Sequence, residues 1–571
     1  MTFRTNLLIG EMLIDEGVIT PEQLEQGLRE QKKTGDFICT ALAKMGIATE
    51  EKIFLVLSRQ LNIPYVKLKD LKIESSVIKK VPAKFASHYR IIPIELKDHT
   101  LTIAMADPLD LRTLDDVRLL LGLEVKGVLS SDVEILDAIR KYYGVGAETL
   151  EKIISQRASP ETLKMAEEGI EDLEVLAEDA SIIKFVNQIL AEAVKEEATD
   201  LHLEPFQNEL RVRARIDGLL YDMKIPESIK FFHAAIVSRI KIMARLDIAE
   251  RRLPHDGRIK IKVSDQELDL RVSIVPTIFG ESVQIRILST QYFLELEKLG
   301  LLPEDLNLLK SVITRPHGII FVTGPTGSGK STTLYASLSR INSTDIKIIT
   351  IEDPVEHQLR GVSQIQVSPH IGLDFAKVLR HILRHDPDVI MVGEVRDVET
   401  GEIAIRSALT GHLVFSTLHT NDAAGAVTRL LDMGMEPFLV ASSVECLIAQ
   451  RLVRLICPDC KIPLSAKAKK ETLDQIKACG FDTKNIDLVE GKGCERCRFT
   501  GYKGRTGIYE IIMMTEPIRE LILKRASSQQ IKRQAISGGM RTLRQDGLRK
   551  VAQGLTTFTE VLRVTQHEEI S

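Results

Sequence analysis

The chain lacks both a long uninterrupted apolar segment and an excess of basic residues. Its 571 residues include 76 Lys plus Arg against 80 Asp plus Glu, a formal net charge of −4. Proteins that bind nucleic acid mainly through phosphate contacts rely on a surplus of Lys and Arg, so this balance argues against that class. No run approaches the roughly 18 apolar residues of a membrane-spanning helix, which argues against an integral membrane protein.

Cysteine is also scarce, and its placement is informative. Four of the seven cysteines form two CxxC pairs, CPDC at 457–460 and CERC at 494–497. The N-terminal stretch MTFRTNLLIGEMLIDEG carries acidic residues within its apolar part and has no small-residue cleavage site, so we expect a cytoplasmic protein without a signal peptide. In that compartment, paired cysteines indicate metal binding or catalysis before disulfides.

The length indicates about three or four domains, and the first, residues 1–143, begins with an internal repeat. A shift of 29 positions aligns Leu13 with Leu42, Gly17 with Gly46, Thr20 with Thr49 and Gln31 with Gln60. Thr20, followed by Pro21 and Gln23, is typical of a helix start with a capping box. The repeat at 6–60 therefore predicts a pair of short helical hairpins, and residues 65–143 alternate strand and helix patterns as α/β folds do.

The remainder divides into three segments by composition and periodicity. Residues 144–180 are rich in Glu and Asp with little to bury, which predicts a mobile acidic linker. Residues 181–298 combine an amphipathic helix with alternating strands such as ELRVRARIDGLL, which predicts a second α/β domain. Residues 299–571 form a larger α/β unit, so the overall expectation is an α/β multidomain protein.

A phosphate-binding loop is the strongest motif in the sequence. GIIFVTGPTGSGKSTTL at 318–334 reads as a strand, a Gly-rich turn and a helix start, and GPTGSGKS satisfies the GxxxxGK[ST] spacing. Its backbone N–H groups and the helix N-terminus suit phosphate, Lys330 can reach the β/γ-phosphates, and Ser331 can hold Mg²⁺. The predicted nucleotide-binding residues here are Gly324, Pro325, Thr326, Gly327, Ser328, Gly329, Lys330, Ser331 and Thr332.

Acids and histidines flank three apolar strands downstream of this loop. The segments are KIITIEDPVEH (347–357), DPDVIMVGEVRD (386–397) and TGHLVFSTLHTNDA (410–423). For any one of them, solvated helix caps and satisfied core histidines are the better explanation. Three together, after a phosphate loop, favour one site, because open α/β sheets bind ligands at the carboxyl ends of strands. The candidate residues are Glu352, Asp353, Glu356, Glu394, His412 and His419.

With these motifs the chain resembles the secretion ATPase superfamily, in its GspE/PulE branch of type II secretion and type IV pilus assembly. GPTGSGKS is similar to the family's Walker A, IEDPVEH to its Asp box, DPDVIMVGEVRD to its Walker B and GHLVFSTLHTNDA to its His box. ATDLHLEPFQNELRVRARIDG is similar to the family's second N-terminal domain, which implies a PAS-like fold for residues 181–298. The resemblance implies a RecA-like ATPase domain that assembles into a hexamer and uses ATP with Mg²⁺.

By motif position, the resemblance also assigns roles. Glu356 corresponds to the catalytic base within the Asp box, whose Glu352 and Asp353 we assign to cofactor binding. Glu394 corresponds to the Walker B glutamate that holds Mg²⁺ through water. His412 and His419 correspond to the His-box residues that sense nucleotide.

Basic residues in the segment 181–298 suit phosphoryl transfer. Arg211, Arg213 and Arg215 share one face of a predicted strand, because side chains alternate with period two. A solvated strand face explains such residues in most proteins. In a phosphoryl-transfer ring, however, Arg from a neighbouring element stabilises γ-phosphate charge, and we predict that at least one of Arg213, Arg258 and Arg271 does so.

The two CxxC pairs predict a structural zinc site of Cys457, Cys460, Cys494 and Cys497. Four thiolates on two turns make a tetrahedral S₄ shell suited to Zn²⁺. The 33-residue spacer contains KETLDQIKACGF, which reads as helix, so the metal would hold a small insertion over 457–497. The alternative is a redox CxxC, which needs no second pair. By resemblance, assembly-type members carry this insertion and retraction ATPases lack it.

The expected function is a cytoplasmic hexameric ATPase that powers pseudopilin assembly in type II secretion, with type IV pilus assembly as the alternative. The resemblance implies partners in the inner membrane, a GspL-like component and a GspF-like platform, that hold the ATPase at the membrane periphery. A DNA-translocating motor shares the phosphate loop, but the charge balance and the absence of an aromatic-studded basic groove argue against it. A nucleotide-sensing scaffold that does not hydrolyse ATP is the third possibility.

The N-terminal repeat resembles paired motifs that bind cyclic di-GMP in some family members. Those motifs begin with Arg-Leu-Gly, where Arg can grip phosphate and Gly allows close approach. Here the first copy reads Leu8-Ile9-Gly10 and the second Phe37-Ile38-Cys39. Both Arg are missing, so we predict that residues 1–143 bind a protein, the GspL-like component, and do not bind cyclic di-GMP.

Overall fold

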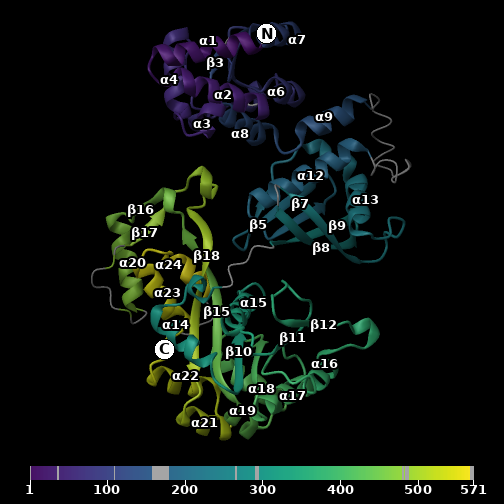
Figure 1. Ribbon diagram of the computed structural model, residues 1–571, viewed down its shortest axis with the longest axis vertical. Helices are drawn as coiled ribbons and strands as arrows, with labels where there is room; N and C mark the ends of the chain where they lie inside the picture. Colours follow the sequence, from purple (N-terminus) through teal and green to yellow (C-terminus); the bar gives the residue numbers. More distant parts are fainter. Residues whose placement is uncertain are drawn as a thin grey trace. The chain divides into compact units, whose positions relative to one another are not determined.

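The computed structural model (Figure 1) consists of two compact units, Met1–Leu288 and Ser289–Ser571. The structure describes residues 2–34, 38–107, 110–156, 179–263, 266–289, 295–478, 481, 486 and 488–565. Among these residues, no helix has both the length and the apolar character that a membrane crossing requires.

The first unit opens with the two predicted helical hairpins. Their helices are α1 (Thr2–Asp15), α2 (Pro21–Thr34), α3 (Ile38–Lys44) and α4 (Glu50–Leu61). Thr20 forms the predicted capping box: its N–H donates to Gln23 Oε1 at 2.9 Å, and its Oγ1 accepts the Gln23 N–H at 3.3 Å. Leu13 and Leu42, equivalent in the repeat, are both fully buried. The prediction of a hairpin repeat is confirmed.

A three-stranded sheet in the order β1-β2-β3 follows the repeat. Its strands are β1 (Ile91–Lys97), β2 (Thr100–Met105) and β3 (Glu124–Leu129). The helical elements are η1 (Leu68–Asp70), α5 (Ser75–Ile78), α6 (Ala83–Tyr89), α7 (Leu111–Leu121) and α8 (Asp132–Tyr143). Residues 65–143 are therefore α/β, as predicted.

The first part of the predicted acidic linker is a packed helix in the structure. Residues Ala147–Gln156 form helix α9, which packs against α6 and α12 (Ala180–Lys195). Leu150 is 1% exposed, and the Glu151 carboxylate accepts the N–H groups of Ala83 and Lys84 at 3.0 and 2.7 Å. The acidic composition of this segment did not predict helix α9, which has an apolar contact surface. Residues 157–178 of the predicted linker lie outside the described residues.

A six-stranded sheet in the order β6-β5-β4-β9-β8-β7 completes the first unit. Its strands are β4 (Asp200–Pro205), β5 (Leu210–Ile216), β6 (Leu219–Asp222), β7 (His255–Val263), β8 (Gln266–Thr277) and β9 (Gly280–Ser289), with η2 (Glu227–Phe232) and α13 (His233–Ala244) between β6 and β7. Apolar side chains of the strands pack with α12 and α13, as Leu203, Val212 and Leu270 do. Because side chains alternate, the opposite face is polar.

The second unit is built on a seven-stranded sheet in the order β12-β11-β13-β14-β10-β15-β18. All neighbours are parallel except β15 and β18. The strands are β10 (Gly318–Thr323), β11 (Ile348–Glu352), β12 (Ser363–Gln366), β13 (Val389–Val392), β14 (Leu413–Leu418), β15 (Val444–Ile456) and β18 (Tyr502–Met513). Strands β10, β11, β13 and β14 are buried over their whole length, which explains their continuous apolar sequences.

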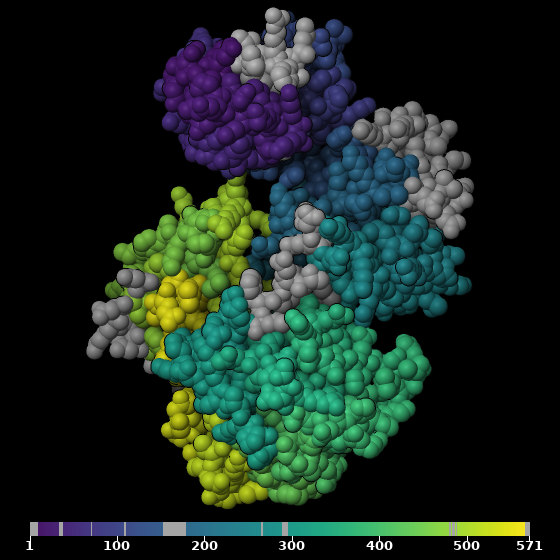
Figure 2. All heavy atoms as spheres, in the orientation of Figure 1, coloured from purple at the N-terminus to yellow at the C-terminus, as the bar shows by residue number. Residues whose placement is uncertain are grey.

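Helices cover both faces of this sheet. One buried cluster joins the strands to η3 (Leu296–Leu299), α14 (Pro303–Val312) and α15 (Lys330–Ile341). The other joins them to α16 (Phe375–Ile382), α17 (Val398–Leu409), α18 (Ala423–Asp432), α19 (Pro437–Ser443) and four C-terminal helices. The C-terminal helices are α21 (Glu516–Leu523), α22 (Ser528–Ser537), α23 (Leu543–Ala552) and α24 (Phe558–Val564). In the space-filling view this last, yellow segment lies directly against the green strand-bearing part (Figure 2).

A small insertion interrupts the sheet between β15 and β18. It holds η5 (Pro458–Cys460), β16 (Lys461–Pro463), α20 (Ala466–Ala478), β17 (Val489–Gly491) and η6 (Glu495–Cys497), and η4 (Pro369–Ile371) lies outside it after β12. β16 and β17 pair antiparallel. The helix predicted within the spacer is therefore present as α20.

Candidate nucleotide and metal sites

The parallel register brings four strand ends to one edge of the large sheet. Thr323, the last residue of β10, is opposite Leu418, the last residue of β14. On the other side of β14, β13 pairs with β11, whose last residue is Glu352. The loops that follow these strands carry the predicted phosphate loop, Asp box, Walker B and His box. The structure thus gathers these four segments at the carboxyl edge, where α/β sheets bind ligands.

The phosphate loop runs from β10 into α15, which begins at Lys330. Gly324 has a φ of +150°, and a Cβ there would lie 2.6 Å from the carbonyl oxygen of Gln450. Only glycine allows this close approach. The Lys330 ammonium group donates to the carbonyl oxygens of Gly324 and Pro325 at 2.8 and 3.2 Å. The lysine is therefore folded over its own loop, at the position where a phosphate would be bound.

Two charged neighbours act on Lys330. Burial lowers the pKa of its ammonium group, the carboxylate of Glu394 opposes that effect, and the guanidinium of Arg451 adds to it. The guanidinium of Arg451 lies beside the phosphate loop, since a Cβ at Gly324 would lie 3.1 Å from its Nη1.

Glu394 connects the Walker B segment with the His box. Its side chain is 12% exposed, and its carboxylate forms an ion pair with Arg396 and lies 3.3 Å from His419 Nε2. Hydrogen bonding to Glu394 raises the pKa of Arg396, and the charge of Asp353 contributes in the same direction. Glu394, His419, Asp353 and the phosphate loop therefore lie together, as the strand-end argument predicts.

Glu356 lies in the loop after β11, and its side chain is half-buried. The Glu356 N–H donates to the Tyr335 Oη of helix α15 at 3.2 Å. The backbone of the predicted base is thus fixed to the same helix that begins with Lys330.

Glu352 differs from the expectation that it binds a cofactor. Its side chain is 4% exposed. One carboxylate oxygen accepts the Tyr335 hydroxyl, and the other accepts Thr350 Oγ1 at 2.6 Å and Gln364 Nε2 at 3.0 Å. The acid faces protein donors inside the unit, because as the last residue of the buried strand β11 it points into the core. Asp353, the next residue, is exposed.

His412 is not brought to this edge. It precedes β14, so it lies at the opposite end of that strand from His419. Its Nδ1 lies 3.0 Å from the carbonyl oxygen of Ser407, and its own carbonyl oxygen accepts the Gly318 N–H. The two histidines flank the strand as predicted, but only His419 joins the phosphate loop, since six strand residues separate the two ends.

Hydrogen bonds between strand ends tie the loops to one another. Thr323 Oγ1 and Thr420 Oγ1 are 2.7 Å apart, and the Thr420 N–H donates to Thr323 Oγ1 at 2.9 Å. Thr417 Oγ1 donates to the Gly393 carbonyl oxygen at 2.7 Å, and the Gly393 N–H donates to the Ile351 carbonyl oxygen at 2.7 Å. The four loops are therefore mechanically connected.

Sequence reasoning missed two contributors from β15. Thr333 Oγ1 donates to Gln450 Oε1 at 2.7 Å, which secures α15 just after the phosphate loop. Arg451 donates to the Asn421 carbonyl oxygen at 2.7 Å, which links the phosphate loop's surroundings to the His-box loop. The available signal was the polar pair Gln-Arg directly after the apolar run CLIA (446–449) in a strand.

The three candidate arginines lie in the first unit, on the polar face of the six-stranded sheet. Arg213 forms a bidentate pair with Glu204, at 2.8 Å for both bonds. Arg258 is opposite Arg271 in the β7–β8 register, and both line a cavity of about 390 Å³. The other lining residues are Asp256, Gly257, Val272, Ser273, Gln284 and Arg286. Arg213 is thus held by Glu204, and Arg258 and Arg271 both contribute to the wall of the cavity.

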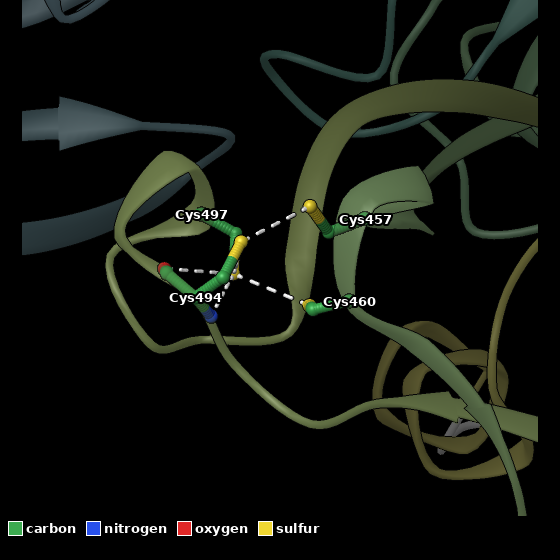
Figure 3. Close-up of side chains that lie close together, drawn as sticks. All are labelled: Cys457, Cys460, Cys494 and Cys497. Atoms are coloured by element: carbon green, nitrogen blue, oxygen red, sulfur yellow. Dashed lines mark hydrogen bonds between the residues drawn. The ribbon is translucent and has the colours of Figure 1, made fainter. Parts of the chain in front are cut away.

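The four predicted metal ligands converge (Figure 3). All four sulfurs lie within 4.8 Å of one another. The Sγ atoms of Cys457 and Cys494 are 3.8 Å apart, and those of Cys460 and Cys497 are 3.7 Å apart. A tetrahedral site with Zn–S bonds of about 2.3 Å requires sulfur separations of about 3.8 Å. The thiols fit one tetrahedral metal ion.

Backbone contacts hold the two cysteine turns together. The Cys457 N–H donates to the Gly501 carbonyl oxygen, and the Lys492 N–H to the Cys460 carbonyl oxygen, both at 2.9 Å. Arg496 pairs with Asp459 across the turns at 2.7 Å. No side chain of the phosphate loop's surroundings takes part in these contacts, so the cluster has the character of a structural site.

Two family models match the chain. One, described as a type II/IV secretion system protein, matches residues 175–563. The other, described as an MshEN domain, matches residues 61–149.

Curated relatives extend over nearly the whole chain. It is 44% identical over 561 residues to the type IV pilus assembly ATPase PilB of Myxococcus xanthus, covering 97% of this chain and 98% of that protein. It is 41% identical over 568 residues to type II secretion system protein E of Xanthomonas campestris, covering 98% of each.

Among solved structures, the ATPase DotB of Legionella pneumophila is similar in fold. The TM-score is 0.50 at 21% identity, covering 67% of this chain and 96% of that one. The likeness concerns the fold alone.

Two substitutions near Lys330 are expected to shift its pKa in opposite directions. Arg451→Gln removes a positive neighbour and is expected to raise the Lys330 pKa, whereas Glu394→Gln removes a negative neighbour and is expected to lower it. Competitive acetylation of the neutral amine, measured by mass spectrometry over a pH series, reports the labelling midpoint of Lys330.

Arg406→Gln, which removes an arginine paired with Glu402 on α17, is the matched control and should leave the midpoint unchanged. A shift in the same direction for Arg451→Gln and Glu394→Gln would contradict the geometry described.

Proposed function

The chain belongs to the family of type II/IV secretion system proteins, and from that premise we propose an ATPase that powers the assembly of pilin-like subunits. Relatives named for type II secretion and for pilus assembly match it to a similar extent. The observation that carries the proposal is the carboxyl edge, where a phosphate loop meets Glu356, Glu394 and His419. We propose that it acts in type II secretion, with type IV pilus assembly as the alternative.

The residues present suit ATP with Mg²⁺. The glycine-rich loop and the N-terminus of α15 offer N–H groups to phosphate, and Lys330 supplies the cation for the β/γ-phosphates. Oxygen donors at this edge, Ser331, Asp353 and Glu394, are of the type that Mg²⁺ prefers. Bound Mg²⁺ neutralises charge on the phosphates.

In this proposal Glu356 and Glu394 have different roles. Glu356 takes the proton of the attacking water, and its backbone bond to Tyr335 keeps it near the phosphate loop. Glu394 orients the metal and is itself oriented by His419 and Arg396. The geometry supports no nucleotide contact for His412 within one chain.

We propose that at least one of Arg213, Arg258 and Arg271 stabilises the charge of the γ-phosphate in the assembled protein. Arg213 forms a bidentate pair with Glu204. Arg258 and Arg271 line a cavity of about 390 Å³, which is large enough for a phosphate group. We infer a homohexamer, held at the inner membrane by GspL-like and GspF-like partners.

Steady-state ATP turnover tests the function. Lys330→Ala should abolish ATP binding and turnover. Glu356→Gln should bind ATP·Mg²⁺ like the parent yet lose turnover by about 10²- to 10⁴-fold, the usual contribution of a general base. Glu394→Gln should lose turnover in a way that added Mg²⁺ partly restores.

Arg406→Gln serves here too as a control for an exposed charge change on the same unit. Parental turnover in a folded Lys330→Ala or Glu356→Gln protein would refute the catalytic assignment.

The tetracysteine cluster is proposed to bind one structural Zn²⁺. Elemental analysis of protein prepared without chelator should give about one zinc per chain, because four thiolates fill a tetrahedral shell. Cys457→Ser should lose the metal and loosen the insertion while ATP binding persists, and Cys446→Ala, which alters a buried thiol outside the cluster, should keep it. Two metals per chain, or none in the parent, would disprove the site.

The N-terminal module is proposed to bind a protein and not cyclic di-GMP. Cys39, where a glycine would admit the ligand, is fully buried, and burial raises the pKa of its thiol. Gly10 is retained for packing, because a Cβ there would lie 2.4 Å from Leu24 Cδ1. Phe37 and the side chain of Leu8 lie outside the described residues.

Calorimetry of the full chain against cyclic di-GMP should therefore show no micromolar binding. Both Arg of the binding motif are absent, and a dianion without a cationic partner gains little from this apolar site. A clear micromolar isotherm would overturn this part of the proposal.

A further inference from the structure

A buried hydrogen-bond network joins helix α15 to the loop that carries Glu356. Its centre is Glu352, 4% exposed, and its link to α15 is Tyr335, 2% exposed. Tyr335 follows Lys330 by five residues on the same helix. The network therefore starts one and a half turns from the phosphate loop.

Both oxygens of Glu352 are engaged by protein donors. Oε2 accepts the Tyr335 hydroxyl, and Oε1 accepts Thr350 Oγ1 at 2.6 Å and Gln364 Nε2 at 3.0 Å. A buried carboxylate without such donors would be strongly unfavourable. Three donors from three separate elements fix its orientation, so it is an anchor for other groups and is turned away from any ligand at the edge.

Two of these three donors, Tyr335 and Gln364, also hold the loop after β11. Tyr335 Oη accepts the Glu356 N–H at 3.2 Å while its proton faces Glu352. A phenol hydroxyl can donate and accept at once. Gln364 Nε2 also donates to the His357 carbonyl oxygen at 2.9 Å, and its Oε1 accepts the Leu359 N–H at 2.6 Å. The loop is thus fixed at three backbone atoms around the predicted base.

Glu352 decides the direction of the Tyr335 hydroxyl. With its proton committed to a carboxylate, the oxygen presents its lone pairs to the Glu356 N–H. The ring of Tyr335 also meets His357 edge to face, with centroids 6.3 Å apart. These contacts set the distance between the start of α15 and the Glu356 backbone.

We propose that Tyr335 is a positioning residue: its hydroxyl, oriented by Glu352, places Glu356 relative to the phosphate loop. This inference rests on the proposed function, since it assigns Tyr335 no contact with substrate and acts only through the base. A base displaced by about 1 Å can lose about 100-fold in rate, whereas binding of ATP through the loop and Lys330 needs no such placement.

The test is Tyr335→Phe in the full chain, which removes one oxygen and preserves the ring. We expect kcat to fall about ten- to a hundredfold, with the KM for ATP·Mg²⁺ and its measured affinity within twofold of the parent. In a Glu356→Gln background the same substitution should lower the residual turnover no further, because both changes act through one group.

Tyr502→Phe is the matched control. Its hydroxyl bonds to Thr557 Oγ1 at 2.6 Å, away from the loop after β11, and its removal should leave kcat unchanged. A parental kcat for Tyr335→Phe, a rise in KM in place of the fall in kcat, or a further loss in the Glu356→Gln background would each overturn the inference while leaving the ATPase proposal intact.

Glu352→Gln gives an independent arm that remains decisive if Tyr335→Phe does not fold. A positioning role predicts a lower kcat with an unchanged Mg²⁺ concentration for half-maximal turnover. A higher Mg²⁺ requirement would make Glu352 a metal ligand and overturn the inference. A parental chain that hydrolyses no ATP would overturn the proposed function first, and this inference with it.

Discussion

The shared carboxyl edge of four buried parallel strands is the constraint on which the site depends. The strands β10, β11, β13 and β14 run parallel to one another. The loops that follow them therefore all begin at the same edge of the sheet. The apolar sequences of these strands place the sheet in the core. The polar residues that directly follow the strands therefore lie at its carboxyl edge. The phosphate loop, the Asp box, Walker B and His419 are neighbours for this reason.

Polar contacts then convert neighbouring loops into one connected site. Thr323 with Thr420, Thr417 with Gly393, and His419 with Glu394 join adjacent strand ends. Each is a single hydrogen bond worth about 0.5–1.5 kcal/mol, but together they limit how far one loop can move without its neighbours. The cysteine cluster is held by backbone bonds of its own, among them the Cys457 N–H to the Gly501 carbonyl oxygen.

Local sequence patterns predicted the features of the fold and of the site that depend on the spacing of nearby residues. The phosphate loop, the hairpin repeat with its Thr20 capping box, the buried strands and the four converging cysteines all follow from residues close together in sequence. The direction of Glu352 could not be predicted, because its donors Tyr335 and Gln364 come from other elements. Arg451 was missed for the same reason, since β15 lies more than 100 residues after the phosphate loop. Helix α9 was missed because a surplus of acidic residues hid its buried contact at Leu150.

Because hydrogen bonds connect the four loops, we expect them to respond to nucleotide as one site. Amide hydrogen exchange of the full chain, with and without a non-hydrolysable ATP analogue and Mg²⁺, measures this directly. We expect protection from exchange to rise together in residues 324–330, 352–357, 393–397 and 419–422. Protection confined to residues 324–330, with the other three segments unchanged, would contradict it.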